Sequence, residues 1–269
     1  MKANLTDVPE TTLWTLHNRA GEAMRPKKAL IKDDKCIEIY QAIDYDYERS
    51  FGKASPAHAL RSVHFDRHLE EFLRRHPEGT IVNLGEGLET QRFRIDNGKA
   101  FWITVDLPES IEIREKFIEP SPRHLHVALS ATDRRWFDLV PEDKPVFITA
   151  QGLFMYFAEQ AVAELVRDIV ERLPAGYLMF DTIPAYFSRK TMSEKGFHVT
   201  KHYVAPKMPW GINRNQIVPT VSVWSDRIKQ VEVRDYLMLW RGLYISFFAF
   251  LMKIGVLKNI APTTAKVTW

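Results

Sequence analysis

Two glycines and an aspartate have the types and the spacing of a nucleotide-binding turn. Gly85 and Gly87 come directly after the apolar run 80–84, where a chain leaving a buried strand turns tightly and leaves its backbone bare for a ligand. Asp106 follows a second apolar run, 101–105, and lies 21 positions after Gly85. In nucleotide-binding βαβ units, an acid about 20 residues beyond the glycines hydrogen-bonds the ribose hydroxyls. The pattern therefore predicts an adenosine-containing ligand at the carboxyl edge of a parallel sheet.

The residue at position 90 narrows the class of adenosine ligand. The dinucleotide fingerprint G-x-G-x-x-G has its third glycine where this chain has Thr90. That glycine lets the first helix pack close to the strand, so that a pyrophosphate sits at the amino end of the helix. Its absence argues against NAD. An adenosine ligand without a pyrophosphate fits better, and S-adenosylmethionine is the leading candidate.

Arg61 carries a positive charge on the apolar face of an expected helix between positions 55 and 79. Phe65, Leu69 and Phe72 follow Arg61 by 4, 8 and 11 positions, so all four side chains share one stripe of the helix. An arginine on a buried face requires a partner. Two interpretations stay open from the spacing: a salt bridge or snorkelling side chain, and a contact with a ligand.

Apolar runs that alternate with helical segments predict the elements that position these residues. Such an alternation is typical of a doubly wound, Rossmann-like α/β fold with a mainly parallel sheet, here of seven strands, and helices on both faces. The strands are expected at 80–84, 101–105, 125–129, 146–150, 177–180, 217–224 and 265–269, the last of them at an edge of the sheet. Ligands bind beyond the carboxyl ends of the parallel strands. The segments just past those ends are 85–90, Asp106, 132–134, 151–156 and 181–186.

The remaining segments suggest how the chain is divided. Residues 1–54 are polar and are expected to form a helical cap, and residues 55–269 the main domain. An insertion at about 183–210, rich in proline, aromatic and basic residues, is expected over the sheet edge as a lid. Asp235 is expected to cap an apolar helix over 236–257. Its longest uncharged run is too short to cross a bilayer, so we expect a buried helix, with a membrane-surface or dimer-interface helix as the alternatives.

Composition excludes several classes of protein. The formal net charge of +3, from 37 basic and 34 acidic residues, gives no electrostatic reason to expect nucleic acid as a partner. Cys36 is the only cysteine, and the amino terminus lacks the apolar run of a signal peptide, so a cytoplasmic location is expected. The histidine pairs 124/126 and 198/202 lack an obvious third ligand, so no metal is expected. The oligomeric state, including a homo-oligomer, stays open.

Five landmarks in the same order carry a family resemblance. They are the Arg61 helix leading to Phe65-Asp66, IVNLGEGLETQRFRI, VDLPESIEIR, the segment 133–136, and ITAQGLFMYF. Over residues 13–182 the chain resembles the leucine carboxyl methyltransferase family, and in particular its bacterial branch of polyketide carboxyl O-methyltransferase-like proteins. The resemblance implies that residues 55–269 form a class I methyltransferase domain with S-adenosyl-L-methionine as cofactor.

The resemblance also implies a role for each matching residue at the methionine end of the cofactor. The arginine that matches Arg61 grips the methionine carboxylate, and Arg19 is expected to reach the same group. Gly85 and Gly87 approach the methionine portion. Gln151 stands where the family usually has glutamate, which contacts the amino group of the cofactor.

At the adenosine end, the resemblance implies that Asp106 holds the ribose. Asp133 matches the acid that reads the adenine amino group, with Arg134 beside it. The family motif usually reads G-L-D-T-R, whereas this chain has Glu89 for the aspartate and Gln91 for the arginine. With Gln151, these departures leave open a catalytically degenerate protein that retains the fold as a binding or regulatory module.

The expected reaction is methylation of the carboxylate of a small polyketide-like or natural-product-like acid to a methyl ester, with S-adenosyl-L-homocysteine as the second product. A carboxylate is already ionised at neutral pH, so the reaction requires alignment and desolvation rather than a general base. Tyr156, on the loop after the fourth expected strand, is the expected contact to the acceptor. Methylation of a phenolic hydroxyl is the alternative reaction, and a nicotinamide dehydrogenase is disfavoured by Thr90.

Overall fold

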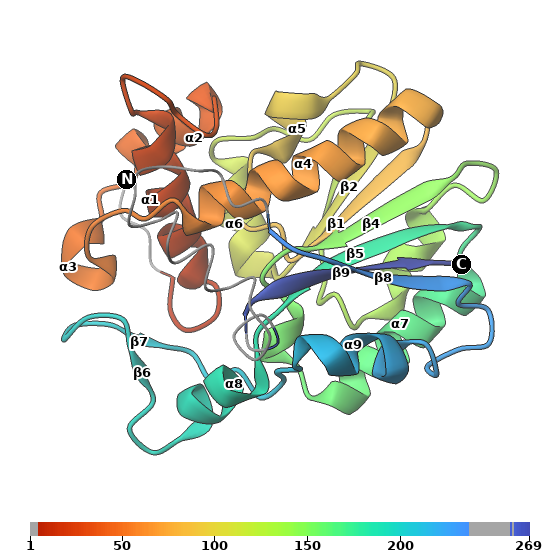
Figure 1. Cartoon of the computed structure of the whole chain (residues 1–269). Helices are drawn as coiled ribbons and strands as arrows, with labels where there is room; N and C mark the ends of the chain where they lie inside the picture. Colours follow the sequence, from red (N-terminus) through yellow and green to blue (C-terminus); the bar gives the residue numbers. More distant parts are fainter. Residues whose placement is uncertain (1–4, 237–258, 260) are drawn as a thin grey trace.

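A seven-stranded sheet forms the centre of the molecule (Figure 1). The structure is a computed structural model, and it describes residues 5–236, 259 and 261–269. The strand order is β3-β2-β1-β4-β5-β9-β8. The first five strands in the chain are parallel, and β9 runs antiparallel to both β5 and β8. The strands of this sheet are β1 Thr80–Leu84, β2 Phe101–Asp106, β3 His124–Ala128, β4 Val146–Ala150, β5 Gly176–Thr182, β8 Gln230–Arg234 and β9 Thr263–Thr268. The predicted Rossmann-like, mainly parallel sheet is confirmed.

Helices cover both faces of the sheet because its inner strands are apolar on both faces. In β1, Ile81 belongs to the buried cluster of Phe65 from α4, and its neighbour Val82 belongs to a second cluster with Val166 from α7. The helices are α1 Thr11–Ala23, α2 Asp34–Ala42, α3 Tyr47–Phe51, α4 Ala57–Arg75, α5 Gln91–Ile95, α6 Pro108–Glu115, α7 Glu159–Arg172, α8 Ala185–Met192 and α9 Arg214–Val221. Two short 3-10 helices, η1 Arg134–Leu139 and η2 Phe154–Tyr156, follow β3 and β4.

The amino-terminal helices and the insertion after β5 lie at the same end of the sheet, on the left in Figure 1. Helices α1 to α3 share a buried cluster that includes Leu16 and Ile39. The insertion holds α8 and an antiparallel pair, β6 Phe197–His198 with β7 Val204–Ala205. The Thr200 hydroxyl donates to the carbonyl of Ser50 at 2.9 Å. This hydrogen bond joins the insertion to the amino-terminal helices. The expected domain boundary at residue 54 stays a prediction.

The predicted strand at 217–224 is wrong. Residues 217–221 of this segment lie in α9, which begins with a capping box between Asn213 and Gln216 and buries Ile217 and Val221 one turn apart. The run of β-branched residues suggested a strand, but the cap and the spacing of four between the buried residues decide for a helix.

Two further differences concern the antiparallel end of the sheet. The strand expected near the carboxyl terminus exists as β9, but it lies between β5 and β8 rather than at the edge. The edge strand β8 was not predicted. The helix expected over 236–257 lies outside the described residues except for Tyr236. Within the part that is described, no helix combines the length and the apolar character needed to cross a bilayer.

Candidate functional site

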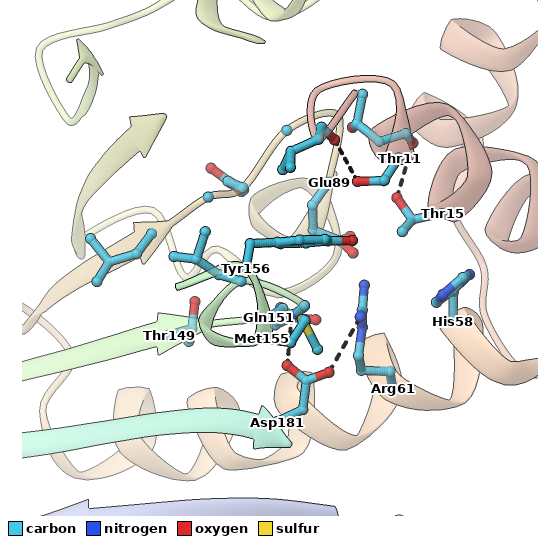
Figure 2. A pocket seen from close by; sticks show the side chains of 18 of the residues that line it. Thr11, Thr15, His58, Arg61, Glu89, Thr149, Gln151, Met155, Tyr156 and Asp181 are labelled. Carbon is cyan, nitrogen blue, oxygen red and sulfur yellow. Dashed lines mark hydrogen bonds and ion pairs between the residues drawn. The ribbon is translucent and has the colours of Figure 1, made fainter. Parts of the chain in front are cut away.

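A cavity of about 1030 Å³ opens at the carboxyl ends of the parallel strands. Its wall is built by the segments that follow β1, β2, β4 and β5, together with α1 and α4 (Figure 2). The volume is at the upper end of the range for small-molecule sites. The predicted residues Arg61, Gly85, Gly87, Asp106, Gln151 and Tyr156 all line it. One site therefore collects residues from across more than 90 positions of the chain.

Asp106, at the end of β2, fixes the conformation of the loop after β1. Asp106 Oδ2 accepts a hydrogen bond from the backbone N–H of Gly87 at 2.6 Å, and Oδ1 accepts one from Leu107 at 2.7 Å. Gly87 has φ +53°, and a Cβ atom there would lie 2.4 Å from the Thr12 hydroxyl. Burial raises the pKa of Asp106, although the two N–H donors oppose this. The Ser110 hydroxyl is a further donor to this carboxylate, and Asp106 also lines the cavity.

Arg114, on α6, fixes the same loop and was not singled out from the sequence. Its Nη1 donates to the carbonyls of Gly87 at 2.7 Å and Glu89 at 2.8 Å, and its Nη2 lies 3.0 Å from the Glu86 carboxylate. The helical spacing that indicates Arg61 also applies to Arg114, because Arg114 follows the buried Ile111 by three positions on a helix. These three contacts of Arg114 fix the conformation of the loop backbone.

Both interpretations of Arg61 are compatible with its position. Its Nη1 donates to Asp181 Oδ2 at 3.3 Å, and the guanidinium also lines the cavity (Figure 2). The backbone N–H of Gly152 donates to the other oxygen of Asp181. A Cβ atom on Gly152 would lie 2.5 Å from Arg61 Nη1. The Arg61 guanidinium therefore packs against the backbone of Gly152, which has no side chain to displace it. It forms an ion pair with Asp181 and also faces the cavity.

Glu89 lines the cavity and also belongs to a buried network of charges that supports the loop. Its carboxylate accepts from Arg19 Nη1 at 2.9 Å, Arg94 Nη1 at 2.8 Å and the Ser62 hydroxyl at 2.7 Å. Burial alone would raise the pKa of Glu89, but Arg19 and Arg94 outweigh it and hold the pKa well below its usual range. Arg19 is 1% exposed and is not among the described residues that line the cavity. The structure thus places Arg19 as a partner of the loop.

Gln91, the second departure from the family motif, belongs to the same network of buried polar groups. The Gln91 amide donates to Asp66 Oδ1 at 2.8 Å, and Arg94 binds both oxygens of Asp66 at 2.7 and 3.0 Å. Gln91 is fully buried. Glu89 and Gln91 therefore form part of the support of the loop, and their contacts to Arg94 and Asp66 explain why a longer acid and an amide fit there.

The remaining predicted residues divide between the cavity and its surroundings. Asp133 caps η1 and forms an ion pair with Arg135 at 2.6 Å, and Arg134 donates to Asp168 at 2.6 Å. Neither Asp133 nor Arg134 is among the described residues that line the cavity. Burial raises the pKa of the Tyr156 hydroxyl, so the phenol is neutral.

Gln151 presents an unused acceptor. Its Oε1 is buried, and no described residue donates a hydrogen bond to it. A buried amide oxygen without a donor is unfavourable by about 1–3 kcal/mol, so a ligand that donates there gains that energy. With the Asp106 carboxylate and the Arg61 guanidinium, the wall offers acceptors for ribose hydroxyls and an ammonium, and a cation for a carboxylate. These groups fit S-adenosylmethionine, which carries all three.

Comparison with known proteins identifies the relatives of this chain. The family model for leucine carboxyl methyltransferase matches residues 13–170. The chain is 33% identical over 182 residues to the tetracenomycin polyketide synthesis O-methyltransferase TcmP of Streptomyces glaucescens, covering 66% of this chain and 67% of TcmP. It is 30% identical to the S-adenosyl-L-methionine-dependent methyltransferase dpfgK of Gibberella zeae, covering 62% of each protein.

The fold is similar to that of the plantazolicin methyltransferase BamL, whose structure was solved with S-adenosylhomocysteine, abbreviated SAH. The TM-score is 0.54 at 8% identity, over 97% of both chains. At this identity the likeness shows the fold alone. The family match covers more than half of the chain and includes the glycine loop, Asp106 and Gln151. The chain therefore belongs to the leucine carboxyl methyltransferase family, and it is an S-adenosyl-L-methionine-dependent methyltransferase.

Proposed function

We propose that this methyltransferase acts on the carboxylate of a small, largely apolar acid of the polyketide or natural-product type and forms its methyl ester. The observation that carries the proposal is that every acidic side chain of the described cavity wall is already engaged. Glu86, Glu89, Asp106, Asp181 and Asp235 each accept from an arginine or a backbone N–H. Without a free base, an acceptor that is already ionised is favoured.

His58 is the histidine among the described residues of the wall, and it supports the same choice. Its Nδ1 accepts a hydrogen bond from the Asn18 amide at 2.8 Å, so this nitrogen is not available to take a proton. The described wall is otherwise rich in apolar side chains, which favour an apolar acceptor: Trp14, Met155, Phe157, Ile183, Phe187 and Met208. The name of TcmP assigns that relative to polyketide synthesis, which agrees with an acceptor of this type.

In this proposal the protein positions and desolvates the reactants. When bound, the cofactor supplies the methyl group on a sulfonium sulfur. One acceptor oxygen forms the new bond to the methyl carbon as the bond from that carbon to sulfur breaks, and no proton moves. The neutral Tyr156 hydroxyl is proposed to hold the acceptor carboxylate by a hydrogen bond. The wall excludes water, which strengthens the nucleophile.

We propose the cofactor contacts from the same wall. Arg61 would bind the methionine carboxylate, Gln151 Oε1 the ammonium and Asp106 the ribose, with Gly85 and Gly87 beside the methionine portion. Asp133 and Arg134 are not among the described residues that line the cavity. Their proposed contacts to the adenine rest on the family resemblance alone.

A panel of aromatic and aliphatic acids, each paired with the phenol or alcohol of the same skeleton, tests the reaction. With trideuteromethyl-labelled cofactor, mass spectrometry should find labelled methyl esters, at a rate that changes little between pH 6 and 8 because no base is titrated. Labelled phenyl ethers without esters would replace this proposal with phenol methylation. No calorimetric binding of S-adenosylmethionine or SAH would identify a degenerate protein.

Replacing Gly152 with alanine should weaken SAH binding about tenfold or more, as measured by calorimetric titration. The new Cβ would lie 2.5 Å from Arg61 Nη1, at φ +66°, so the guanidinium must move and the charged contact is lost, about 1.5–3 kcal/mol. Gly98→Ala is the matched control, because Gly98 has φ +76° and nothing within 4 Å of a Cβ atom. Equal SAH affinity of the Gly152 variant and the wild type would contradict this role of Arg61.

A further inference from the structure

His58 lies on α4 three residues before Arg61, so the two side chains point to the same side of the helix. Both line the cavity, and Figure 2 shows the imidazole beside the guanidinium. The Trp14 ring packs edge-on against the imidazole, with 5.5 Å between ring centroids and an interplanar angle of 88°. The ring is thus held in place by contacts that do not involve a ligand.

The hydrogen bonds around His58 define which ring nitrogen carries the proton. The backbone N–H of Ser55 donates to Asn18 Oδ1 at 2.9 Å, which turns the amide nitrogen of Asn18 toward the imidazole. Asn18 Nδ2 then donates to His58 Nδ1 at 2.8 Å. Because Nδ1 accepts, the proton of the neutral ring is on Nε2. No described residue accepts a hydrogen bond from Nε2.

The ring stays neutral at physiological pH. Burial lowers the pKa of His58 well below its usual value, and the positive charges of Arg61 and Arg19 lower it further. His58 therefore presents one N–H donor of fixed direction and no charge. Beside it, the Arg61 guanidinium presents several donors in one plane, of which Nη1 is used by Asp181.

We propose that His58 Nε2 and the Arg61 guanidinium together bind the carboxylate of the methionine portion of the cofactor. A carboxylate has two oxygens, and two donors of fixed direction on one helix face define its orientation as well as its position. Arg61 supplies the charge. His58 supplies a neutral donor, which avoids placing a second cation beside Arg61 in a buried site. This inference rests on the cofactor and is independent of the choice of methyl acceptor.

The test compares two ligands that differ only at the methionine portion. SAH carries the carboxylate, whereas 5′-methylthioadenosine keeps the adenosine and the sulfur but lacks the amino acid. His58→Phe retains a ring against Trp14 and removes the donor. We expect this variant to bind SAH about tenfold more weakly, the loss of one hydrogen bond to a charged group, and to bind 5′-methylthioadenosine within about twofold of the wild type.

Two further variants complete the comparison. His58→Gln, which restores an N–H donor, should recover most of the SAH affinity. His202→Phe makes the same change at an exposed histidine of the insertion and should leave both affinities unchanged. An equal loss of affinity for the two ligands in His58→Phe, or no loss for either, would overturn the inference.

A measurement on the unaltered protein applies even where His58→Phe does not fold. With ¹⁵N-labelled histidine, the Nε2 proton of His58 should move downfield when SAH is added and stay in place when 5′-methylthioadenosine is added, because only SAH brings an anionic acceptor to it. Identical spectra with the two ligands would also overturn the inference.

Discussion

Replacing Glu89 with alanine should lower the free energy of unfolding by about 3–5 kcal/mol, because it removes one of the two carboxylates, with that of Asp33, that neutralise the buried Arg19 and Arg94. Glu89 Oε1 lies 2.9 Å from Arg19 Nη1 and 2.8 Å from Arg94 Nη1, and both arginines are almost completely buried. The same carboxylate also accepts from Ser62 and from the backbone of Thr90. Removing it breaks four contacts at once.

Urea unfolding followed by circular dichroism measures this loss. The matched control is Glu112→Ala on α6, which removes an exposed acid that lies 3.0 Å from Lys116. A surface ion pair of this kind contributes about 0–1 kcal/mol, so the control should unfold almost as the wild type does. A loss below about 1 kcal/mol in the Glu89 variant would show that other groups carry the network.

The free energy of unfolding at low pH provides a second test of the role of Glu89. Arg19 and Arg94 hold the pKa of Glu89 below that of the unfolded chain, against the effect of burial. Its contribution to stability is therefore present above the unfolded pKa, near about 4.3, and is lost as the pH falls toward the folded value. The difference in stability between the wild type and Glu89→Ala should shrink as the pH falls below about 4.

Most of the predicted site residues that line the cavity are those whose position follows from the strand that precedes them. Gly85, Asp106 and Gln151 each come at or just past the end of a parallel strand, and such ends meet at one edge of the sheet. Arg61 was found from its helical register. Each of these arguments uses local pattern and a general rule of topology.

The residues that lie elsewhere depend on partners that the local pattern does not name. Arg19 pairs with Glu89, which is 70 positions away, and Arg134 pairs with Asp168 at a separation of 34. His58 becomes a fixed donor only because Asn18, 40 positions earlier, binds its other nitrogen. Arginine and histidine accept many partners, so tertiary packing decides whether they support a loop or face a cavity.

Replacing Asp106 with asparagine should weaken SAH binding about 100-fold. Asp106 Oδ2 and Oδ1 already accept from the backbone of Gly87 and Leu107, and each is expected to accept from a ribose hydroxyl as well. An asparagine removes the charge and turns one of the two acceptors into a donor, which opposes one backbone N–H. Two hydrogen bonds to a charged group contribute about 3 kcal/mol or more, which corresponds to about 100-fold in affinity.

Comparing two ligands separates the effect of Asp106→Asn from the effects of changes at Arg61 and His58 on α4. Because the ribose is present in both molecules, Asp106→Asn should weaken SAH and 5′-methylthioadenosine by the same factor, whereas changes at Arg61 or His58 should weaken SAH alone. Asp138→Asn, at an exposed acid beside Arg172, serves as the control. SAH binding within about threefold of the wild type would contradict the ribose contact, since a loss of about 0.7 kcal/mol is too small for a charged acceptor. A selective loss for SAH would instead place the methionine portion at Asp106 and reverse the orientation of the cofactor in the cavity.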